Sequence, residues 1–170
     1  NRPLFLQGDI TDTTALKVSI DKAAKVHGPI TTLINNAAND KRHSAEEVTT
    51  EFWDWMIEVN LKAYFFTCQA ILPHMRNAGF GSIINFSSIS YMMGNAGYPI
   101  YTACNSAING LSRSLAREFG PYKIRVNALA PGWVLTQKQK DLWVTEEGLT
   151  AHVARQCLKD TLDPEDIVGG

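Results

Sequence analysis

Ser88 and Tyr101, two hydroxyl side chains thirteen positions apart, are the residues of this chain best suited to proton-transfer chemistry. A serine and a tyrosine that share one reacting oxygen can hold it by a hydrogen bond and exchange a proton with it. Tyr101 lies near the start of a helix predicted to begin around Pro99, so Asn105 falls one turn further along on the same face. This spacing predicts a proton-transferring enzyme that interconverts a carbonyl and an alcohol.

Asn105 occupies the position where such chemistry would use a cation. A positive charge beside the phenol of Tyr101 would stabilise the phenolate and lower the pKa of the phenol, whereas an asparagine amide offers hydrogen bonds and no charge. We therefore expect activity that is strongly reduced near neutral pH, with an optimum shifted to alkaline pH. We also expect that replacing Asn105 by lysine raises turnover.

The composition indicates a compact domain that handles small molecules. The 170 residues are 45% hydrophobic, which suffices for one domain with a core, and 16 basic residues nearly balance 17 acidic ones. Without a basic run we expect neither nucleic acid nor an anionic membrane as a partner. The apolar stretches have the length of strands or are broken, so we predict a cytoplasmic location. The cysteines and histidines lack metal-ligand spacing, which predicts reduced thiols and no metal site.

Strands and helices are predicted to alternate, which favours an α/β fold with a parallel sheet and helices on both faces. The predicted strands are Leu4–Leu6, 32–34, 81–88 and 124–130, and the predicted helices run to about Val26, from Glu51 to Met75 with a late interruption at Pro73, and from Tyr101 to Phe119. In such sheets ligands bind beyond the carboxyl ends of the strands. Distinctive polar or backbone-exposing residues follow these ends: Asp9, Asn35, Asn36, Ser87, Ser88, Pro131 and Gly132.

These motifs together resemble the short-chain dehydrogenase/reductase family in residue type and spacing. The matching positions are Asp9, Asn36, Asn60, Ser88, Tyr101 and the pair Pro131-Gly132. The resemblance runs along the whole chain and implies that residues 1–170 are part of one domain with a Rossmann-type, doubly wound parallel sheet. It also implies an NAD(P)-dependent oxidoreductase whose cofactor is NAD, with NADP also open, and the cofactor supplies the hydride chemistry.

The resemblance implies a role for each matching position. Ser88 would anchor the substrate oxygen, and Tyr101 would exchange its proton. Asn60 would join the proton relay, and Asn105 stands at the position of the family's lysine. The implied cofactor-binding residues are Asp9, Ile10, Asn36, Ala37, Ala38, Tyr101, Asn105, Pro131, Gly132, Val134 and Thr136. Taken singly, each position also has a plain structural interpretation, such as a helix cap at Asp9 or Ser88.

Three loops carry a narrower resemblance, to bacterial pentose 1-dehydrogenases and above all to those acting on D-xylose. They are Asn35–His43, Gln139–Gly148 and Ala154–Lys159. A cyclic sugar offers hydroxyls to polar side chains and C–H faces to aromatic ones. The candidate substrate residues supply both kinds: Ser88, Asn39, Tyr101, Trp133 and Trp143, and also Asp40, His43 and Gln137. The resemblance therefore implies oxidation of an aldose, a pentose in particular, at its anomeric carbon to a lactone.

Two alternatives to sugar oxidation stay open. Reduction of a 3-oxoacyl thioester would call for an apolar channel and a basic docking patch, and the polar loop at 39–43 speaks mildly against it. A non-catalytic member that binds dinucleotide is supported by Asn105 alone. The resemblance also implies a homodimer or homotetramer built by the helices at about 51–75 and 101–119, with Trp53 and Phe65 facing a second subunit.

The chain departs from the family pattern at its ends and at one glycine. No Gly-x-x-x-Gly-x-Gly precedes Leu4, and the sequence stops at Gly170, short of the family's last strand. We therefore expect a fragment without the N-terminal βαβ unit and without that strand, in which the Leu4 strand has no neighbour. Ala38 stands where the family has glycine, and we expect a mild effect because a methyl matters only at positive φ or under close cofactor approach.

Overall fold

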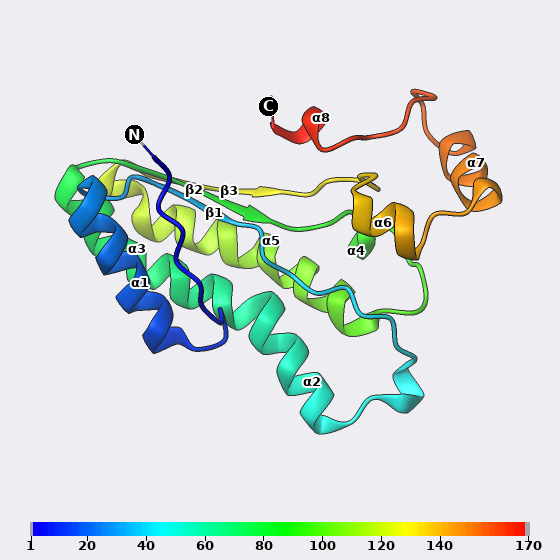
Figure 1. The fold of residues 1–170 in the computed structure, drawn as a ribbon, viewed down its shortest axis with the longest axis horizontal. Helices are drawn as coiled ribbons and strands as arrows, with labels where there is room; N and C mark the ends of the chain where they lie inside the picture. Colours follow the sequence, from blue (N-terminus) through cyan, green and yellow to red (C-terminus); the bar gives the residue numbers. More distant parts are fainter. Residues whose placement is uncertain (1, 169–170) are drawn as a thin grey trace. The chain divides into compact units, whose positions relative to one another are not determined.

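A three-stranded parallel sheet forms the centre of the fold in a computed structural model, which describes residues 2–168. Its strands are β1 (Thr32–Asn35), β2 (Gly81–Phe86) and β3 (Ile124–Leu129), in the order β1-β2-β3 (Figure 1). Strand, helix and strand alternate, so the predicted α/β fold with a parallel sheet is confirmed. Asn1, Gly169 and Gly170, which belong to the predicted terminal segments, lie outside the described residues.

The register aligns the carboxyl ends of the strands at one edge of the sheet. Asn35 of β1 pairs with Asn85 of β2, and Asn85 pairs with Ala128 of β3. Because the strands are parallel, the segments that begin at Asn36 and Ser87 leave the sheet next to one another. This is the edge at which parallel α/β sheets bind their ligands.

Three helices cover one face of the sheet: α1 (Thr13–His27), α3 (Ala63–Ala78) and α5 (Pro99–Phe119) (Figure 1). The core lies between these helices and the strands. Ile71 and Met75 of α3 and Phe119 of α5 pack around Ile83 of β2, and each of these side chains is at most 3% exposed. Burying a side chain of this size stabilises the fold by about 1.5–3 kcal/mol.

The other face of the sheet has no helix from the described residues up to Ala130. In β1, Leu33 packs into the core while its neighbour Ile34 is 57% exposed, because successive side chains point to opposite faces. The predicted second helical layer is therefore absent from this part of the chain. The strand order explains this: both crossovers step in the same direction across the sheet, and right-handed crossovers then place their helices on the same face.

Residues 50–78 form a continuous helical stretch with a π-helical segment inside it. The stretch runs through α2 (Thr50–Ile57), the π-helical η2 (Glu58–Lys62) and α3. Thr49 caps its start by accepting a hydrogen bond from the N–H of Phe52 at 3.2 Å. The predicted interruption at Pro73 is wrong, because Pro73 lies within α3 and the helix continues to a left-handed cap at Gly79, φ 78°.

Leu4–Leu6 does not form the strand that its sequence predicts. Phe5 is 85% exposed and Leu4 is 38% exposed, so the segment is not buried either. A strand needs a neighbour for its backbone N–H and C=O groups. The described strands pair only among themselves, in the order β1-β2-β3, so this segment has no ladder to join. The isolation of this strand, expected from the family's strand order, accounts for the difference.

The chain divides into two compact units, one up to Ala130 and one from Pro131 onward. The second unit holds α6 (Gln137–Leu142), α7 (Glu146–Ala154) and α8 (Glu165–Val168), with a parallel bridge between Val134 and Leu162. The short elements of the first unit are η1 (Ala45–Glu47), α4 (Ser90–Met93) and η3 (Gly120–Tyr122). That residues 1–170 belong to one domain stays a prediction. No helix in the described part of the chain has the length and apolar character of a membrane span.

Candidate active site

Tyr101 lies in the first turn of α5 with its side chain half-buried. Burial raises the pKa of its phenol above the ordinary value of 10.0, and hydrogen bonds with the side chains of Ser88 and Asn105 act in the opposite direction. The nearby carboxylate of Asp40 raises the pKa further. The structure thus brings Ser88 and Asn105 close to the phenol of Tyr101. No cation is among the groups that shift the pKa of this phenol.

Asn105 is held from both sides, and only 3% of it is exposed. Its side-chain Nδ2 donates to the backbone carbonyl of Tyr101 at 2.9 Å. Its backbone carbonyl accepts hydrogen bonds from Ser87 Oγ at 2.9 Å and from Asn109 Nδ2 at 2.8 Å. These contacts fasten the end of β2 to the first two turns of α5. Asn109 was not among the predicted site residues, although its spacing of four from Asn105 places both on one helix face.

Ser88 follows β2 and has two contacts. Its Oγ accepts a hydrogen bond from the N–H of Ser90 at 3.1 Å, at the start of the short helix α4. The same side chain lies near the phenol of Tyr101 and lowers the pKa of that phenol. Ser88 precedes Ile89, the N-cap residue of α4, so the interpretation of Ser88 as the cap itself is wrong. Its part in catalysis stays a prediction.

Asn60 lies in η2 and connects this helical segment to the loop after β1. Its Nδ2 donates to the carbonyl of Met56 at 2.9 Å, and its Oδ1 accepts the N–H of Asn39 at 2.8 Å. Asn60 is 2% exposed, so both halves of its amide are satisfied inside the protein. The structure therefore gives this side chain a role in holding Asn39, and its part in a proton relay stays a prediction. π-Helical segments of this kind occur frequently at functional sites.

A buried polar network ties the sheet to α5 below the site. Asn35 Nδ2 donates to Asn85 Oδ1 at 2.9 Å, and Asn85 Nδ2 donates to Ser112 Oγ at 3.0 Å. Asn85 is fully buried, so the amide of its side chain is satisfied inside the protein. Asn35 lies at a strand end, as predicted, but the network itself could not be predicted because its members are far apart in the chain.

Asp9 and Ile10 precede α1, and Asp9 is exposed. The Asp9 carboxylate accepts hydrogen bonds from the N–H of Thr11 at 2.9 Å and from Thr11 Oγ1 at 2.8 Å, and these bonds lower its pKa. The helix cap is Asp12, whose Oδ1 accepts from the N–H groups of Thr14 and Ala15. The interpretation of Asp9 as the cap is therefore wrong.

Asn36, Ala37 and Ala38 follow β1 and are exposed. Lys123 is the one non-glycine residue with positive φ among the described residues, so the methyl of Ala38 meets no backbone restriction. The small side chains of Ala37 and Ala38 leave the backbone at this strand end accessible. This fits the nucleotide that the sequence implies, which would lie against exposed amide groups. Asn105 fits a ribose hydroxyl through hydrogen bonding alone.

The remaining predicted residues belong to the second unit: Pro131, Gly132, Trp133, Val134, Thr136, Gln137 and Trp143. Trp133 Nε1 donates to Gln139 Oε1 at 2.9 Å, and its ring meets that of His152 edge-on at 5.2 Å. Thr136 caps α6 through the N–H of Gln139, and Trp143 follows the same helix. Trp133 is therefore fixed within its unit by polar and aromatic contacts.

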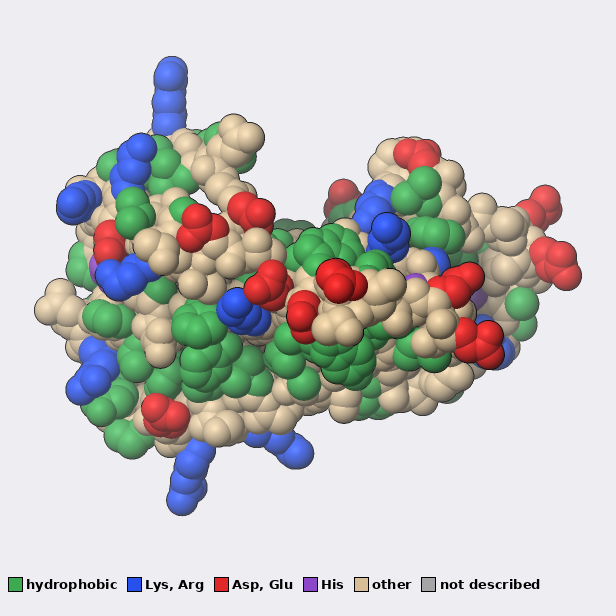
Figure 2. All heavy atoms as spheres, turned by 90° about the horizontal axis from the view of Figure 1, so that it is seen from below, with side chains coloured by type: hydrophobic (Ala, Val, Ile, Leu, Met, Phe, Trp, Pro, Cys, Tyr) green, Lys and Arg blue, Asp and Glu red, His purple; other side chains and the backbone are tan. Residues whose placement is uncertain are grey.

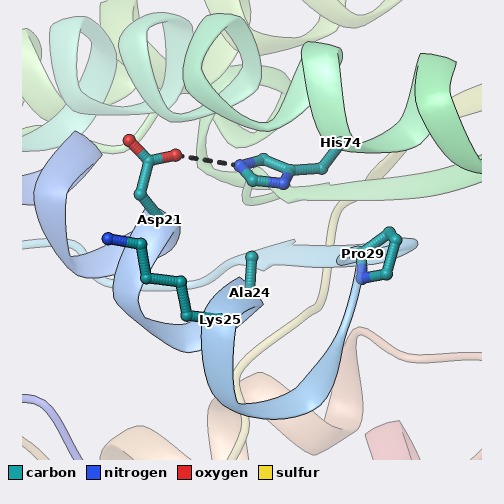
Figure 3. Close-up of a pocket in the computed structure, with 5 residues that line it drawn as sticks. All are labelled: Asp21, Ala24, Lys25, Pro29 and His74. Carbon is teal, nitrogen blue, oxygen red and sulfur yellow. Dashed lines mark hydrogen bonds and ion pairs between the residues drawn. The ribbon is translucent and has the colours of Figure 1, made fainter.

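A cleft of about 380 Å³ lies between α1 and α3, lined by Asp21, Ala24, Lys25, Pro29 and His74 (Figure 3). Asp21 Oδ1 lies 3.0 Å from His74 Nε2, and Asp21 Oδ2 accepts from Lys17 Nζ at 2.9 Å. Asp21 therefore joins α1 to α3. None of the predicted site residues lines this cleft.

The family model of the short chain dehydrogenases matches residues 1–147, and the chain belongs to this family. It is 44% identical over 167 residues to "Probable galactose dehydrogenase GalD" of Rhizobium meliloti (strain 1021), covering 98% of this chain and 65% of that protein. It is 39% identical over 165 residues to D-xylose 1-dehydrogenase of Caulobacter vibrioides, covering 97% of this chain and 64% of that protein. The chain thus spans just under two thirds of the length of these relatives.

The fold is also similar to solved structures of the family. A protein of Beutenbergia cavernae, assigned as an NAD(P)-dependent gluconate 5-dehydrogenase and containing NADP at low occupancy, superimposes with a TM-score of 0.87 at 30% identity. The match covers 96% of this chain and 66% of that one. The likeness supports the Rossmann-like parallel sheet as the fold.

Proposed function

We propose that the full-length protein is an NAD(P)-dependent dehydrogenase that oxidises an aldose at its anomeric carbon. The placement of Tyr101, half-buried at the start of α5, near the side chains of Ser88 and Asn105 is the observation that carries the proposal. The substrate class is supported by the relatives named as galactose and D-xylose dehydrogenases. Family membership supports the reaction type.

In this proposal the sugar hydroxyl lies between Ser88 and Tyr101. Ser88 holds its oxygen by a hydrogen bond, and the ionised Tyr101 takes its proton as the C–O bond becomes a carbonyl. A nicotinamide cofactor, when bound, accepts the hydride from the same carbon. The ring oxygen stays attached to that carbon, so the product is a lactone. In the reverse direction the phenol returns the proton to the carbonyl oxygen.

The proposed cofactor is NAD, with NADP as the alternative. Asn36, Ala37 and Ala38 would receive its adenosine half at the end of β1, with Asp9 and Ile10 at the adenine. Tyr101 and Asn105 would contact the nicotinamide ribose, and the second unit would add Pro131, Gly132, Val134 and Thr136. Ser88, Asn39, Tyr101, Trp133 and Trp143 are the proposed sugar-binding residues.

A non-catalytic role is a second candidate, because the residue at position 105 brings no charge to the phenol. A protein of this kind would bind the dinucleotide and turn over no sugar. Cofactor binding measured by calorimetry, next to an absence of turnover, would distinguish it from the enzyme.

Self-association is also part of the proposal. The helices α2 and α3 expose aromatic side chains, with Trp53 46%, Trp55 37% and Phe65 41% exposed. Figure 2, which views the molecule from below, shows apolar side chains gathered in the middle of a face with acidic and basic side chains around them. We propose that this aromatic surface forms the contacts of a homodimer or homotetramer in the cytoplasm. Analytical ultracentrifugation of the protein and of Trp53→Asp tests this surface.

The enzymatic proposal is tested by following nicotinamide reduction in the full-length protein. D-galactose, D-xylose, L-arabinose and D-gluconate are each offered with NAD and with NADP, and Tyr101→Phe serves as the matched variant that lacks only the phenolic oxygen. The proposal expects aldose-dependent reduction that Tyr101→Phe abolishes. Reduction with gluconate alone, or equal rates in both proteins, would contradict it.

A further inference from the structure

The loop Asn39–His43, here called the strap, is attached at both of its ends to elements that surround Tyr101. At one end the N–H of Asn39 donates to Asn60 Oδ1 at 2.8 Å. At the other end the N–H of His43 donates to the carbonyl of Gly97, just before α5, at 2.8 Å. The strap therefore bridges η2 and the start of the helix that carries Tyr101.

His43 contacts the first turn of α5 through its ring. Its Nε2 lies 3.3 Å from the backbone nitrogen of Ile100, and the N–H of Ile100 points at this ring nitrogen as a donor. The first N–H groups of a helix have no partner inside the helix and need an external acceptor. Tyr98, at the N-cap position, supplies no side-chain cap, so His43 takes over this function from 57 residues away.

The two partners of the imidazole select one of its tautomers. Nδ1 lies 2.8 Å from the carbonyl of Lys41, which can only accept, while Nε2 faces the N–H of Ile100, which can only donate. Both contacts are satisfied together only by the neutral tautomer that carries its proton on Nδ1. An imidazolium would direct a second donor at the N–H of Ile100 and would place a positive charge at a helix N-terminus, where it is unfavourable.

Aromatic contacts hold the strap in place over the same turn. The His43 ring meets Phe52 of α2 edge-on at 5.0 Å, and the guanidinium of Arg42 lies 4.1 Å from the centre of the Tyr98 ring. Tyr98 in turn meets Tyr101 edge-on at 5.9 Å. Two routes thus lead from the strap to Tyr101, one through the backbone of Ile100 and one through the ring of Tyr98.

We propose that His43 is a positioning residue, whose neutral imidazole caps α5 and thereby fixes the phenol of Tyr101 beside Ser88. The charged groups around it on the strap are Asp40, Lys41 and Arg42. His43 touches neither cofactor nor substrate in this role. The inference rests on the proposed function for its effect on turnover, whereas the cap itself can be observed without any substrate.

The matched pair His43→Gln and His43→Asn tests the cap. The amide oxygen of glutamine reaches the place of Nε2 and can accept the N–H of Ile100, whereas the amide oxygen of asparagine reaches only the place of Nδ1. His43→Leu removes both the Nδ1–H donor and the Nε2 acceptor, and His27→Gln, at the exposed end of α1, is the control for changing a histidine.

We expect His43→Asn and His43→Leu to lower kcat by about tenfold or more, since small displacements of a catalytic group have effects of this order, while cofactor affinity stays within about twofold. His43→Gln keeps kcat within about threefold of the parent protein, as a retained acceptor predicts. Equal losses of kcat in the glutamine and asparagine variants would overturn the positioning role.

The cap is measured separately by ¹⁵N NMR of the imidazole and by amide hydrogen exchange in the first turn of α5. The proposal expects the Nδ1–H tautomer of His43, and it expects faster exchange at Ile100 in His43→Asn than in His43→Gln. The Nε2–H tautomer, an imidazolium at neutral pH, or equal exchange in both variants would overturn it. If the cap is present and no sugar is turned over, the proposed function fails while the cap stands.

Discussion

Replacing Asn105 by lysine is the sharpest test of how this site controls the proton on Tyr101. Asn105 is 3% exposed and its side chain lowers the pKa of the Tyr101 phenol, so an ammonium group reaching from this position would lie close to the phenolate and partly out of water. At a separation of about 5 Å and an effective dielectric of about 20, a unit charge stabilises the phenolate by roughly 3 kcal/mol. This corresponds to roughly 100-fold more phenolate at a pH below the pKa of the phenol.

The expected gain in turnover is between about 10- and 100-fold at neutral pH, because a phenolate that forms more readily is also a weaker base. The sign follows from the shift that burial imposes: a pKa raised above 10.0 keeps Tyr101 protonated at neutral pH, so activity of the parent protein rises as the pH rises. Lysine lowers this pKa. The ratio of variant to parent activity is therefore largest at neutral pH and shrinks toward alkaline pH.

The assay is the initial rate of nicotinamide reduction at saturating sugar, measured across neutral and alkaline pH. Asn105→Met is the matched control, since its side chain approaches lysine in length and carries no charge. An equal gain in the methionine variant, or a ratio that does not change with pH, would refute the electrostatic account of position 105.

Three further outcomes are expected. Ser88→Ala lowers kcat by about 100-fold with cofactor affinity retained, as loss of an oxygen-holding donor predicts, and an unchanged kcat in steady-state assays would contradict its role. Gly81→Ala destabilises the fold by about 1–3 kcal/mol in urea denaturation, because the added methyl would lie 2.7 Å from Cγ of the buried Met75 side chain. An unchanged midpoint of unfolding would contradict this packing. A thiol reagent titrates one cysteine of the folded chain, the exposed Cys157, because burial raises the pKa of the other two thiols to about 11; three fast-reacting thiols would contradict their burial.

Much of the fold could be predicted because its signals are local. The strands at β1, β2 and β3 are short runs rich in β-branched residues between helical segments. The helix predicted to end at Met75 continues instead to a cap at Gly79. The segment Leu4–Leu6 carries the same local signal, yet it is not a strand because strand formation needs a paired neighbour. The single helical layer of the first unit likewise depends on strand order rather than on any local pattern.

The candidate site divides in the same way. The approach of Ser88, Tyr101 and Asn105 follows from a strand end next to a helix start, which the spacing indicates. The contact between His43 and Ile100 could not be predicted, because it joins residues 57 positions apart and depends on the path of the strap. Likewise, only the hydrogen bonds of Asp12 in the structure show that Asp12, and not Asp9, caps α1.

The proposed reaction is tested most directly with D-xylose and D-galactose deuterated at the anomeric carbon, incubated with oxidised cofactor and the full-length protein. If the protein oxidises an aldose at this carbon, mass spectrometry finds the deuterium on the nicotinamide ring and the sugar is recovered as the lactone. Deuterium that stays on the sugar while the nicotinamide becomes reduced would contradict oxidation at the anomeric carbon. A cofactor that stays oxidised with both sugars would contradict the proposed aldose dehydrogenase.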